Sequence, residues 1–204
     1  MHFHPGAKPE FVHHVESRQA SLRDELATVF AAVHGPAVLE IGCGHGHFLS
    51  RYAHDHPHQF CVGIDLLKDR LERAARKRER AGLTNLHLVK AEATEFLECL
   101  PAGVRFESVF LLFPDPWPKK RHHKNRLVRA DFMAALARHM APAGRFFFRT
   151  DHAEYFETGR NVLASHPQWR IETAAVWPCD EATVFQLKAA EFHSVVAATA
   201  PQAG

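Results

Sequence analysis

The 204-residue chain has few cysteines and no long apolar run. Its four cysteines lie far apart and form no C-x-x-C pair, which is typical of reduced thiols rather than of a disulfide framework. No apolar stretch approaches the ~20 residues that a membrane-spanning helix needs, and the first residues lack the apolar core of a signal peptide. Repeats and low-complexity tracts are also missing. These absences predict a soluble, cytoplasmic protein with no membrane partner.

The composition is that of a globular protein. Hydrophobic residues make up 46% of the chain and charged residues 24%, which excludes collagen-like and disordered classes. A domain of this length can bury roughly 70% of the surface that its unfolded chain exposes. We therefore expect a single domain over residues 1–204, with an N-terminal helix within 1–35 and a core over 36–204.

Short apolar runs alternate with helical periodicity along most of the chain. Strands are predicted at 37–41, 60–64, 86–89, 107–112 and 145–148. Helices are predicted at 10–34, from 47 onward, and at 67–81, 127–140 and 153–164. Two later strand-like runs, 169–177 and 184–196, have no helical period between them. The pattern predicts an α/β fold with a mostly parallel sheet, helices on both faces and an antiparallel C-terminal edge.

The formal net charge of +2 conceals a strongly basic segment. Six cations and no acid lie between Asp115 and Asp131, so the rest of the chain carries 2 − 6 = −4. The six are Lys119, Lys120, Arg121, Lys124, Arg126 and Arg129. Charge gathered in this way indicates either an anionic partner or a solvated face.

A glycine-rich turn follows the first predicted strand and precedes a helix, with the sequence Leu39-Glu-Ile-Gly-Cys-Gly-His-Gly46. Glycines here allow a tight turn and a close approach of the backbone to a ligand at the helix N-terminus. A dinucleotide site favours G-x-G-x-x-G, whereas the third glycine comes one position early in this loop. A purely structural turn and a dinucleotide site remain alternatives, although Asp65, at the end of the second strand, favours a bound nucleoside.

The E-x-G-x-G-x-G loop resembles the first motif of class I S-adenosylmethionine methyltransferases. The resemblance implies a Rossmann-like class I methyltransferase fold with S-adenosyl-L-methionine as cofactor. No metal is expected, because the histidine clusters have no Cys or acidic partner at ligand spacing. The resemblance also implies that Asp65 accepts hydrogen bonds from the ribose hydroxyls and that Glu92 faces the adenine, where the family usually has Asp. An exposed glutamate at a helix start is the alternative for Glu92. The implied cofactor-binding residues are Glu40, Gly42, Gly44, Gly46, Asp65, Glu92 and Asp115.

A proline-rich basic loop follows the fourth predicted strand, with the sequence Phe113-Pro-Asp-Pro-Trp-Pro-Lys-Lys-Arg-His-His-Lys-Asn-Arg126. Ligands of open α/β sheets bind at the carboxyl ends of strands, so the loop is expected to line the reaction site. Its prolines are expected to hold Asp115 and Trp117 rigidly. A buried carboxylate, an aromatic face and six cations would suit a flipped nucleobase on a phosphate backbone. A solvated charge run beside a capping Asp115 is the alternative.

This loop is very similar to the signature of tRNA (guanine-N7-)-methyltransferases, and Arg149-Thr-Asp151 resembles that family's next motif. The resemblance implies methyl transfer to N7 of a guanine in the variable loop of tRNA, with Asp115 as the catalytic residue. The family's T-x-F-E segment corresponds to Thr183-Val-Phe-Gln186, in which glutamine replaces the acid. The implied substrate-binding residues are Lys119, Asp151, Thr183, Phe185 and Gln186.

Two departures from the family concern the grip on the substrate. The family usually carries a basic N-terminal arm, whereas residues 2–14 here contain one cation, Lys8. Gln186 is the second departure. Two other functions therefore remain possible: methylation of an exocyclic amine, and an RNA-binding paralogue without turnover. The sequence leaves open whether the protein is a monomer or a homodimer, and the run His54, His56 and His58 is remote from the predicted catalytic edge.

Overall fold

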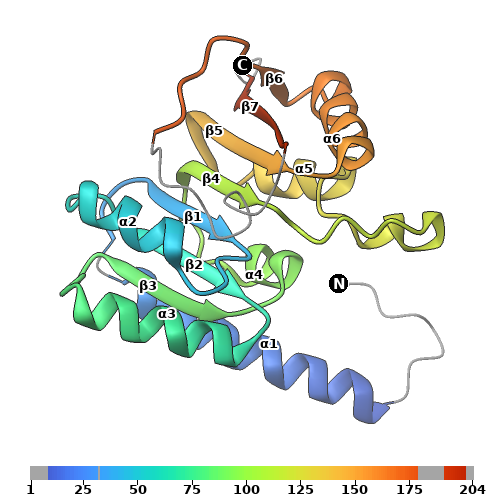
Figure 1. The fold of residues 1–204 in the computed structure, drawn as a ribbon. Coiled ribbons are helices and arrows are strands. Elements are labelled where there is room, and N and C mark those ends of the chain that lie inside the picture. Colours follow the sequence, from blue (N-terminus) through green and yellow to red (C-terminus); the bar gives the residue numbers. More distant parts are fainter. Residues whose placement is uncertain (1–8, 32, 179–190, 201–204) are drawn as a thin grey trace.

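The computed structural model describes residues 9–31, 33–178 and 191–200 (Figure 1). Its seven strands form one sheet in the order β3-β2-β1-β4-β5-β7-β6. The strands are β1 (Ala37–Ile41), β2 (Cys61–Asp65), β3 (Leu86–Lys90), β4 (Phe106–Leu112), β5 (Met140–Thr150), β6 (Trp169–Ile171) and β7 (His193–Thr199). Every strand predicted up to residue 148 is present, which confirms the α/β class.

The sheet is parallel from β3 to β5 and antiparallel beyond it. The last strand, β7, lies between β5 and β6 and pairs antiparallel with both, which confirms the predicted antiparallel C-terminal edge. The expected run 169–177 is a strand only over Trp169–Ile171. Of the expected run 184–196, residues 184–190 lie outside the described part, and the strand begins at His193.

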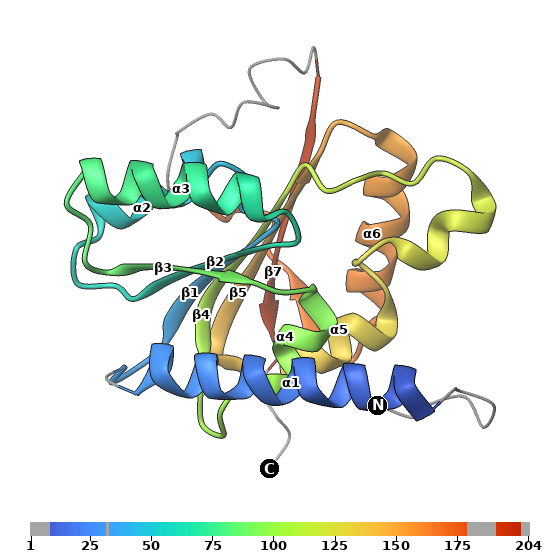
Figure 2. The same ribbon diagram turned by 90° about the horizontal axis from the view of Figure 1, so that it is seen from below.

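Helices cover both faces of the sheet (Figure 2). They are α1 (Pro9–Phe30), α2 (His47–Asp55), α3 (Lys68–Arg80), α4 (Ala93–Cys99), α5 (Ala130–Ala137) and α6 (Ala153–Ser165), with a 3-10 helix η1 (Lys120–Asn125). Helices α2 and α3 lie on one face, and α1, α4 and α5 on the other. None of the described helices is long and apolar enough to cross a membrane.

Strand alternation divides the core into two clusters, one on each face. On the α2 side, Phe48 and Tyr52 pack against Phe110 of β4, whose ring stacks on Phe147 of β5 at 4.7 Å between centroids. The α1 side buries a larger set that includes Leu26, Phe96, Phe106 and Phe132. Burying such a side chain contributes about 1.5–3 kcal/mol, so the sheet is held rigidly from both sides.

Two stretches differ from the sequence prediction. The helix expected over 127–140 is shorter, since α5 begins at Ala130 and ends at Ala137, and β5 already begins at Met140. Ala143 adopts a positive φ of 57° there, and an added Cβ on Gly144 would meet the carbonyl oxygen of Phe106 at 2.8 Å. The close approach to β4 accompanies a register shift between the two strands. Helix α4 was not predicted, since its seven residues are too few for helical periodicity to be visible.

Candidate functional site

Five predicted site segments meet at one edge of the sheet. The strand order reverses between β1 and β4, and ligands of open α/β sheets bind at the carboxyl ends of strands beside such a reversal. The glycine loop follows β1 there, and the proline-rich loop follows β4 (Figure 1). The acids at the ends of the other strands are Asp65 after β2, Glu92 after β3 and Asp151 after β5.

The glycine loop adopts a backbone that other residues disfavour. Gly42, Gly44 and Gly46 have φ values of 74°, 53° and 66°, all in the left-handed region. Gly46 also lies against α3, where an added Cβ would approach the Cβ of Ala74 to 2.9 Å. Glycine is therefore required at this position both for conformation and for packing between the loop and the helix.

Asp65 is buried at the end of β2 and fixes the shape of the loop. Its Oδ2 accepts a hydrogen bond of 2.9 Å from the backbone N–H of Gly44, and its Oδ1 accepts one of 2.9 Å from Leu67. Arg70 of α3 lies 3.9 Å from Oδ2. A carboxylate offers about four acceptor positions, so capacity for two hydroxyl donors is left.

Glu40 is the most unusual group at this edge. Its side chain is 4% exposed, and its Oε2 is buried with no hydrogen-bond partner among the described residues. Burial raises the pKa of Glu40 well above its usual value, and the negative charge of Asp65 acts in the same direction, whereas a hydrogen bond from the Leu49 backbone opposes both. Leaving a buried acceptor unpaired costs about 1–3 kcal/mol, so the group is poised to accept a donor from a ligand.

Glu40 distinguishes between the cofactors that a glycine loop can hold, whereas an acid in the place of Asp65 would suit the ribose of either one. A dinucleotide would bring its pyrophosphate anion toward the loop, close to the buried Glu40. S-adenosylmethionine instead presents an ammonium group and a sulfonium beside a single carboxylate, so it is a net cation, and its ribose hydroxyls can donate hydrogen bonds. The unpartnered acceptor Oε2 of Glu40 therefore fits S-adenosylmethionine better than a dinucleotide.

Glu92 caps helix α4. Its side chain accepts a hydrogen bond of 3.0 Å from the backbone N–H of Glu95, which satisfies one of the free donors of the first helical turn. The structural alternative of a helix-start glutamate is therefore realised, although the side chain is half-buried rather than fully exposed. A contact between Glu92 and an adenine stays a prediction.

The proline-rich loop presents Asp115 to solvent, so the expectation of a buried carboxylate is wrong. The loop leaves β4 through Phe113, whose backbone N–H donates to the carbonyl of Arg149 on β5 over 2.8 Å. Phe113 and Trp117 have positive φ values of 50° and 46°, which are uncommon for bulky residues and indicate a locally strained loop. Trp117 is 37% exposed and meets the ring of His122 edge-on.

Arg126, one of the six loop cations, is buried rather than directed at solvent. Its guanidinium donates to the carbonyl of Pro116 over 2.8 Å and pairs with both carboxylate oxygens of Glu154 over 3.1 and 2.8 Å. It also lies over the ring of Tyr155, 4.9 Å from the centroid. The Tyr155 hydroxyl accepts hydrogen bonds from the backbone N–H groups of Leu127 and Val128. These contacts fasten the loop to α6.

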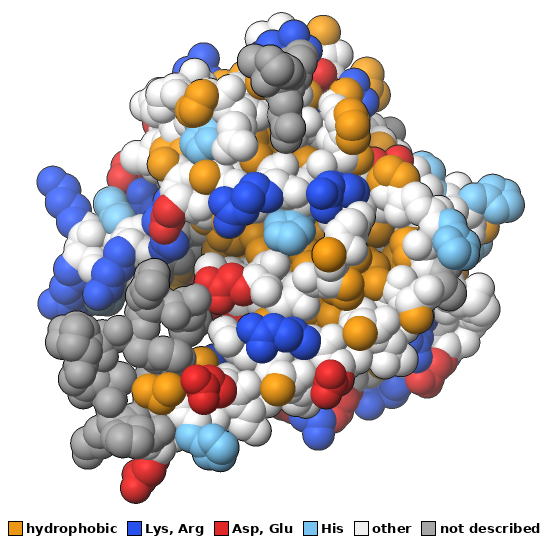
Figure 3. Space-filling view, turned by 180° about the vertical axis from the view of Figure 1, so that it is seen from behind, with side chains coloured by type: hydrophobic (Ala, Val, Ile, Leu, Met, Phe, Trp, Pro, Cys, Tyr) orange, Lys and Arg blue, Asp and Glu red, His pale blue; other side chains and the backbone are white. Residues whose placement is uncertain are grey.

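The expectation that all six cations are available to a partner is therefore wrong, because Arg126 and Arg129 are engaged within the protein. Arg129 pairs with Asp131 over 3.0 Å and donates to the carbonyl of Lys124. Four cations remain exposed on the outer part of the loop: Lys119, Lys120, Arg121 and Lys124. Figure 3 shows Lys and Arg side chains projecting together at its left edge, the side to which the half-turn carries η1.

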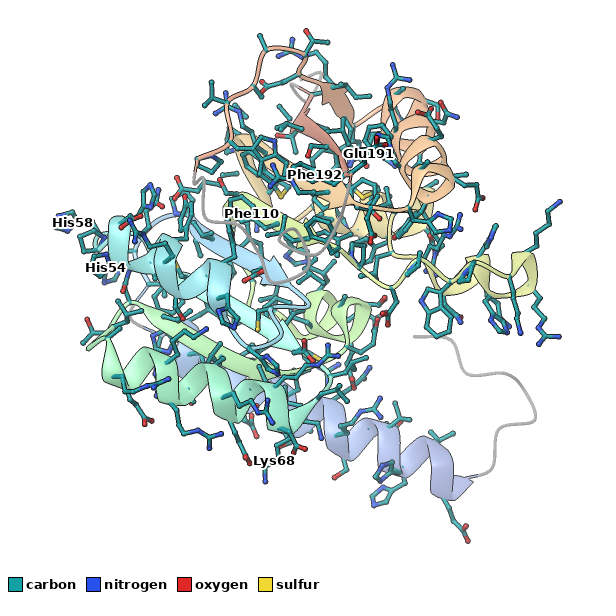
Figure 4. The ribbon with its side chains drawn as sticks, in the orientation of Figure 1. His54, His58, Lys68, Phe110, Glu191 and Phe192 are labelled. Carbon is teal, nitrogen blue, oxygen red and sulfur yellow. The ribbon has the colours of Figure 1, made fainter. Side chains whose placement is uncertain are left out.

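The end of β5 adds an arginine held between aromatic rings, which the sequence did not reveal. The guanidinium carbon of Arg149 lies 3.9 Å from the ring centroid of Trp177 and 4.7 Å from that of Phe192, which Figure 4 labels beside β7. Its Nε donates to the hydroxyl of Ser194 over 2.9 Å. Asp151 follows and is exposed. Three predicted substrate residues, Thr183, Phe185 and Gln186, lie outside the described residues.

The histidine run and the other tryptophan do not belong to this edge. Figure 4 places His54 and His58 near the end of α2, on the side of the sheet away from η1. No cluster of metal-ligating side chains occurs among the residues that the structure describes. Trp169 is buried, and its indole N–H donates to the carbonyl of Met133 over 3.0 Å, so this residue packs in the core.

Comparison with known families extends the sequence resemblance. A family described as putative methyltransferase matches residues 34–199. A tRNA (guanine-N(7)-)-methyltransferase of Geobacter metallireducens is 41% identical over 138 residues, covering 65% of this chain and 65% of that protein. The enzyme of the same name from Syntrophotalea carbinolica is 40% identical, covering 62% and 56%. The chain thus spans about half to two thirds of the length of such curated relatives.

Solved structures share the fold at low sequence identity. The 16S rRNA (adenine(1408)-N(1))-methyltransferase of Catenulisporales acidiphilia, solved with S-adenosylmethionine, superposes with a TM-score of 0.60 at 19% identity, covering 89% of this chain and 93% of that one. The precorrin-6y C5,15-methyltransferase of Geobacter metallireducens gives 0.56 at 15% identity, covering 88% of both. The sheet order and the flanking helices are thus those of class I methyltransferases.

Proposed function

Because the chain belongs to the family of putative methyltransferases, we propose that it transfers the methyl group of S-adenosylmethionine to N7 of a guanine in the variable loop of tRNA. The observation that carries the proposal is the meeting of two segments at one sheet edge. The glycine loop with Glu40 and Asp65 lies at the ends of β1 and β2, and the basic loop with Asp115 leaves the adjacent strand β4.

The cofactor would be held by residues that the structure has already arranged. Asp65 would accept hydrogen bonds from the ribose hydroxyls while it keeps its hydrogen bonds from the backbone N–H groups of Gly44 and Leu67. Glu40 would accept a hydrogen bond from the cofactor's ammonium group through its unpartnered Oε2. Glu92 would lie toward the adenine. When bound, the cofactor supplies an activated methyl group on a sulfonium.

Guanine N7 carries an in-plane lone pair and no proton, so its methylation needs no general base. The task of the protein is to hold N7 in line with the methyl group and to exclude misoriented bases. Such orientation can lower the activation barrier by several kcal/mol. Asp115 is exposed at the rim of the site and would accept hydrogen bonds from the Watson–Crick N–H groups of the guanine. The buried Arg126 would keep that carboxylate in place through the Pro116 carbonyl.

The exposed cations of the outer loop would hold the tRNA backbone. Lys119, Lys120, Arg121 and Lys124 are directed at solvent on one short segment next to Asp115. Phosphate contacts of this kind position a nucleic acid without reading its sequence. Asp151, which follows β5, would bind the substrate from the side of the site opposite to the glycine loop.

Incubation of the purified protein with bulk tRNA and radiolabelled S-adenosylmethionine tests the proposal. We expect N7-methylguanine in the variable loop, detected by chemical cleavage at the modified base. Asp115→Asn should reduce the rate by orders of magnitude, because Asp115 would orient the guanine, and should leave the fold intact, because the side chain is exposed. Label on an exocyclic amine would contradict the N7 assignment, and tRNA binding without any label would indicate a non-catalytic paralogue.

A further inference from the structure

Helix α3 separates its charges onto two sides. It carries seven Lys or Arg residues and three Asp or Glu residues, a net charge of 7 − 3 = +4. Leu71 and Ala74 face the core. One flank contains Lys68 with the acids Glu72 and Glu79, and Lys68 pairs with Glu72 over 3.7 Å. The other flank contains a basic stripe at helical spacings i, i+3, i+7 and i+10: Arg70, Arg73, Lys77 and Arg80.

The basic stripe faces the glycine loop. The Nζ of Lys77 donates to the carbonyl of His45 over 3.2 Å, and Arg70 lies 3.9 Å from Asp65. Burial lowers the pKa of His45, and the positive charges of Arg73, Arg70 and Lys77 lower it further, so three members of the stripe act on the tip of the loop. The stripe therefore begins at the edge where the cofactor would bind.

Two members of the stripe have their charge directed outward. Arg73 and Arg80 are exposed, and neither forms an ion pair with any other residue in the described ranges. Lys77 and Arg70, in contrast, already contact the loop and Asp65. Asp69 lies one helical turn before Arg73, but it forms no ion pair with Arg73 or Arg80 in the described ranges. Cations that no acid of the helix neutralises indicate an anionic partner more strongly than a surface of mutually paired charges does.

We propose that the α3 stripe is a second phosphate-binding surface for tRNA, in which Arg73 and Arg80 contact the RNA backbone on the β3 side of the site. This inference rests on the proposed function, since it takes tRNA as the anionic partner. The outer loop grips the RNA beside β4 and β5, and α3 grips it beside β2 and β3, at the opposite end of the parallel sheet (Figure 1). The RNA would then straddle the cofactor edge.

Such an arrangement has a physical consequence for affinity. Each phosphate contact releases counterions, so it contributes to the steepness with which affinity falls with salt concentration. Contacts on two separate elements also restrict the rotation of the bound RNA and so orient the acceptor base.

The test compares the wild-type protein with the double variant Arg73→Gln/Arg80→Gln. Both substitutions leave Arg70 and Lys77, the residues that touch Asp65 and His45, unchanged. If both arginines contact phosphates, the slope of log affinity against log salt should become shallower by about 1.4–1.8. Binding of S-adenosylhomocysteine should stay the same, and thermal unfolding should shift little because both sites are exposed.

Lys68→Gln is the matched control, because it removes one cation from the opposite flank of the same helix. Figure 4 shows Lys68 projecting from the lower side of α3. The control should leave the salt slope unchanged. An unchanged slope in the double variant, or an equal effect per charge in the control, would overturn the stripe proposal, as would a wild type that binds no RNA. If the wild type binds RNA through the stripe but methylates no tRNA guanine, the proposed function fails and the stripe stands.

Discussion

Replacing Glu40 with glutamine removes a buried ionisable group from the proposed cofactor site while keeping the size of the side chain. The carboxylate is 4% exposed, and its Oε2 has no hydrogen-bond partner among the described residues. The substitution is therefore expected to act in opposite directions on two quantities. It should relieve the ligand-free fold of a buried charge, and it should weaken the binding of the cofactor.

The effect on the fold depends on pH. Burial raises the pKa of Glu40 well above the ordinary value of 4.5. The folded protein therefore holds this proton more tightly than the unfolded chain does. The associated stability is present below pH 4.5 and is lost as the pH rises through the raised pKa. The variant has no such proton, so its free energy of unfolding relative to wild type should increase with pH, by at most about 1.4 kcal/mol per unit.

The effect on the cofactor follows from one charged hydrogen bond. A hydrogen bond to an ionised group contributes about 1.5–3 kcal/mol, and a glutamine carbonyl replaces only part of it. Affinity for S-adenosylhomocysteine should therefore fall by about 10- to 150-fold. The loss should be largest at neutral and alkaline pH, where ligand binding favours the ionised Glu40 of the wild type.

Urea unfolding at a series of pH values and calorimetric titration with S-adenosylhomocysteine measure the two effects. Glu107→Gln is the matched control, since burial also raises the pKa of Glu107 but the residue lies near the amino end of β4. The control should bind S-adenosylhomocysteine like the wild type. If Glu40→Gln binds equally well, Oε2 is not a cofactor acceptor. A stability difference that is constant with pH would refute the raised pKa.

Three further predictions follow from the loops. Gly46→Ala should destabilise the fold by about 2–4 kcal/mol, because a left-handed φ and a clash with α3 add together, whereas Gly82→Ala, with a φ of 62° but open space, should lose only about 1–2 kcal/mol in the same denaturation assay. Arg126→Met should lower the free energy of unfolding by about 1–3 kcal/mol and slow methyl transfer without changing affinity for S-adenosylhomocysteine; normal turnover would contradict its positioning role. Arg121→Met and Lys124→Met should each make the slope of log tRNA affinity against log salt shallower by about 0.7–0.9. Each should leave the free energy of unfolding within about 0.5 kcal/mol of wild type. An equal change in slope for Arg126→Met would contradict the burial of Arg126.

The local features of the fold were available in the sequence. Apolar runs such as 37–41 and 60–64 predicted strands because each is short, continuously apolar and bounded by turn residues, and the structure has strands at Ala37–Ile41 and Cys61–Asp65. The glycine loop was predicted from spacing alone, since its three left-handed positions each favour glycine. The placement of Asp65 followed as well, because parallel strands bring their carboxyl ends to one edge.

Contacts between distant segments were not available in this way. Arg126 looked like one more cation in a basic run, and it is buried because Glu154, 28 residues later, lies on the helix that packs against it. Asp115 looked like a buried carboxylate because prolines surround it, yet the loop turns it outward to solvent. Neither outcome has a signal in the local sequence.

The same division explains the two basic surfaces. The sequence determined that cations gather in the outer loop and along α3, and helical spacing alone separates Arg73 from Glu72 and Glu79. Only the tertiary structure decided that the stripe faces the glycine loop and which cations stay exposed. Periodicity records which face a residue lies on, whereas the partner that neutralises its charge is chosen by packing between elements that are far apart in the chain.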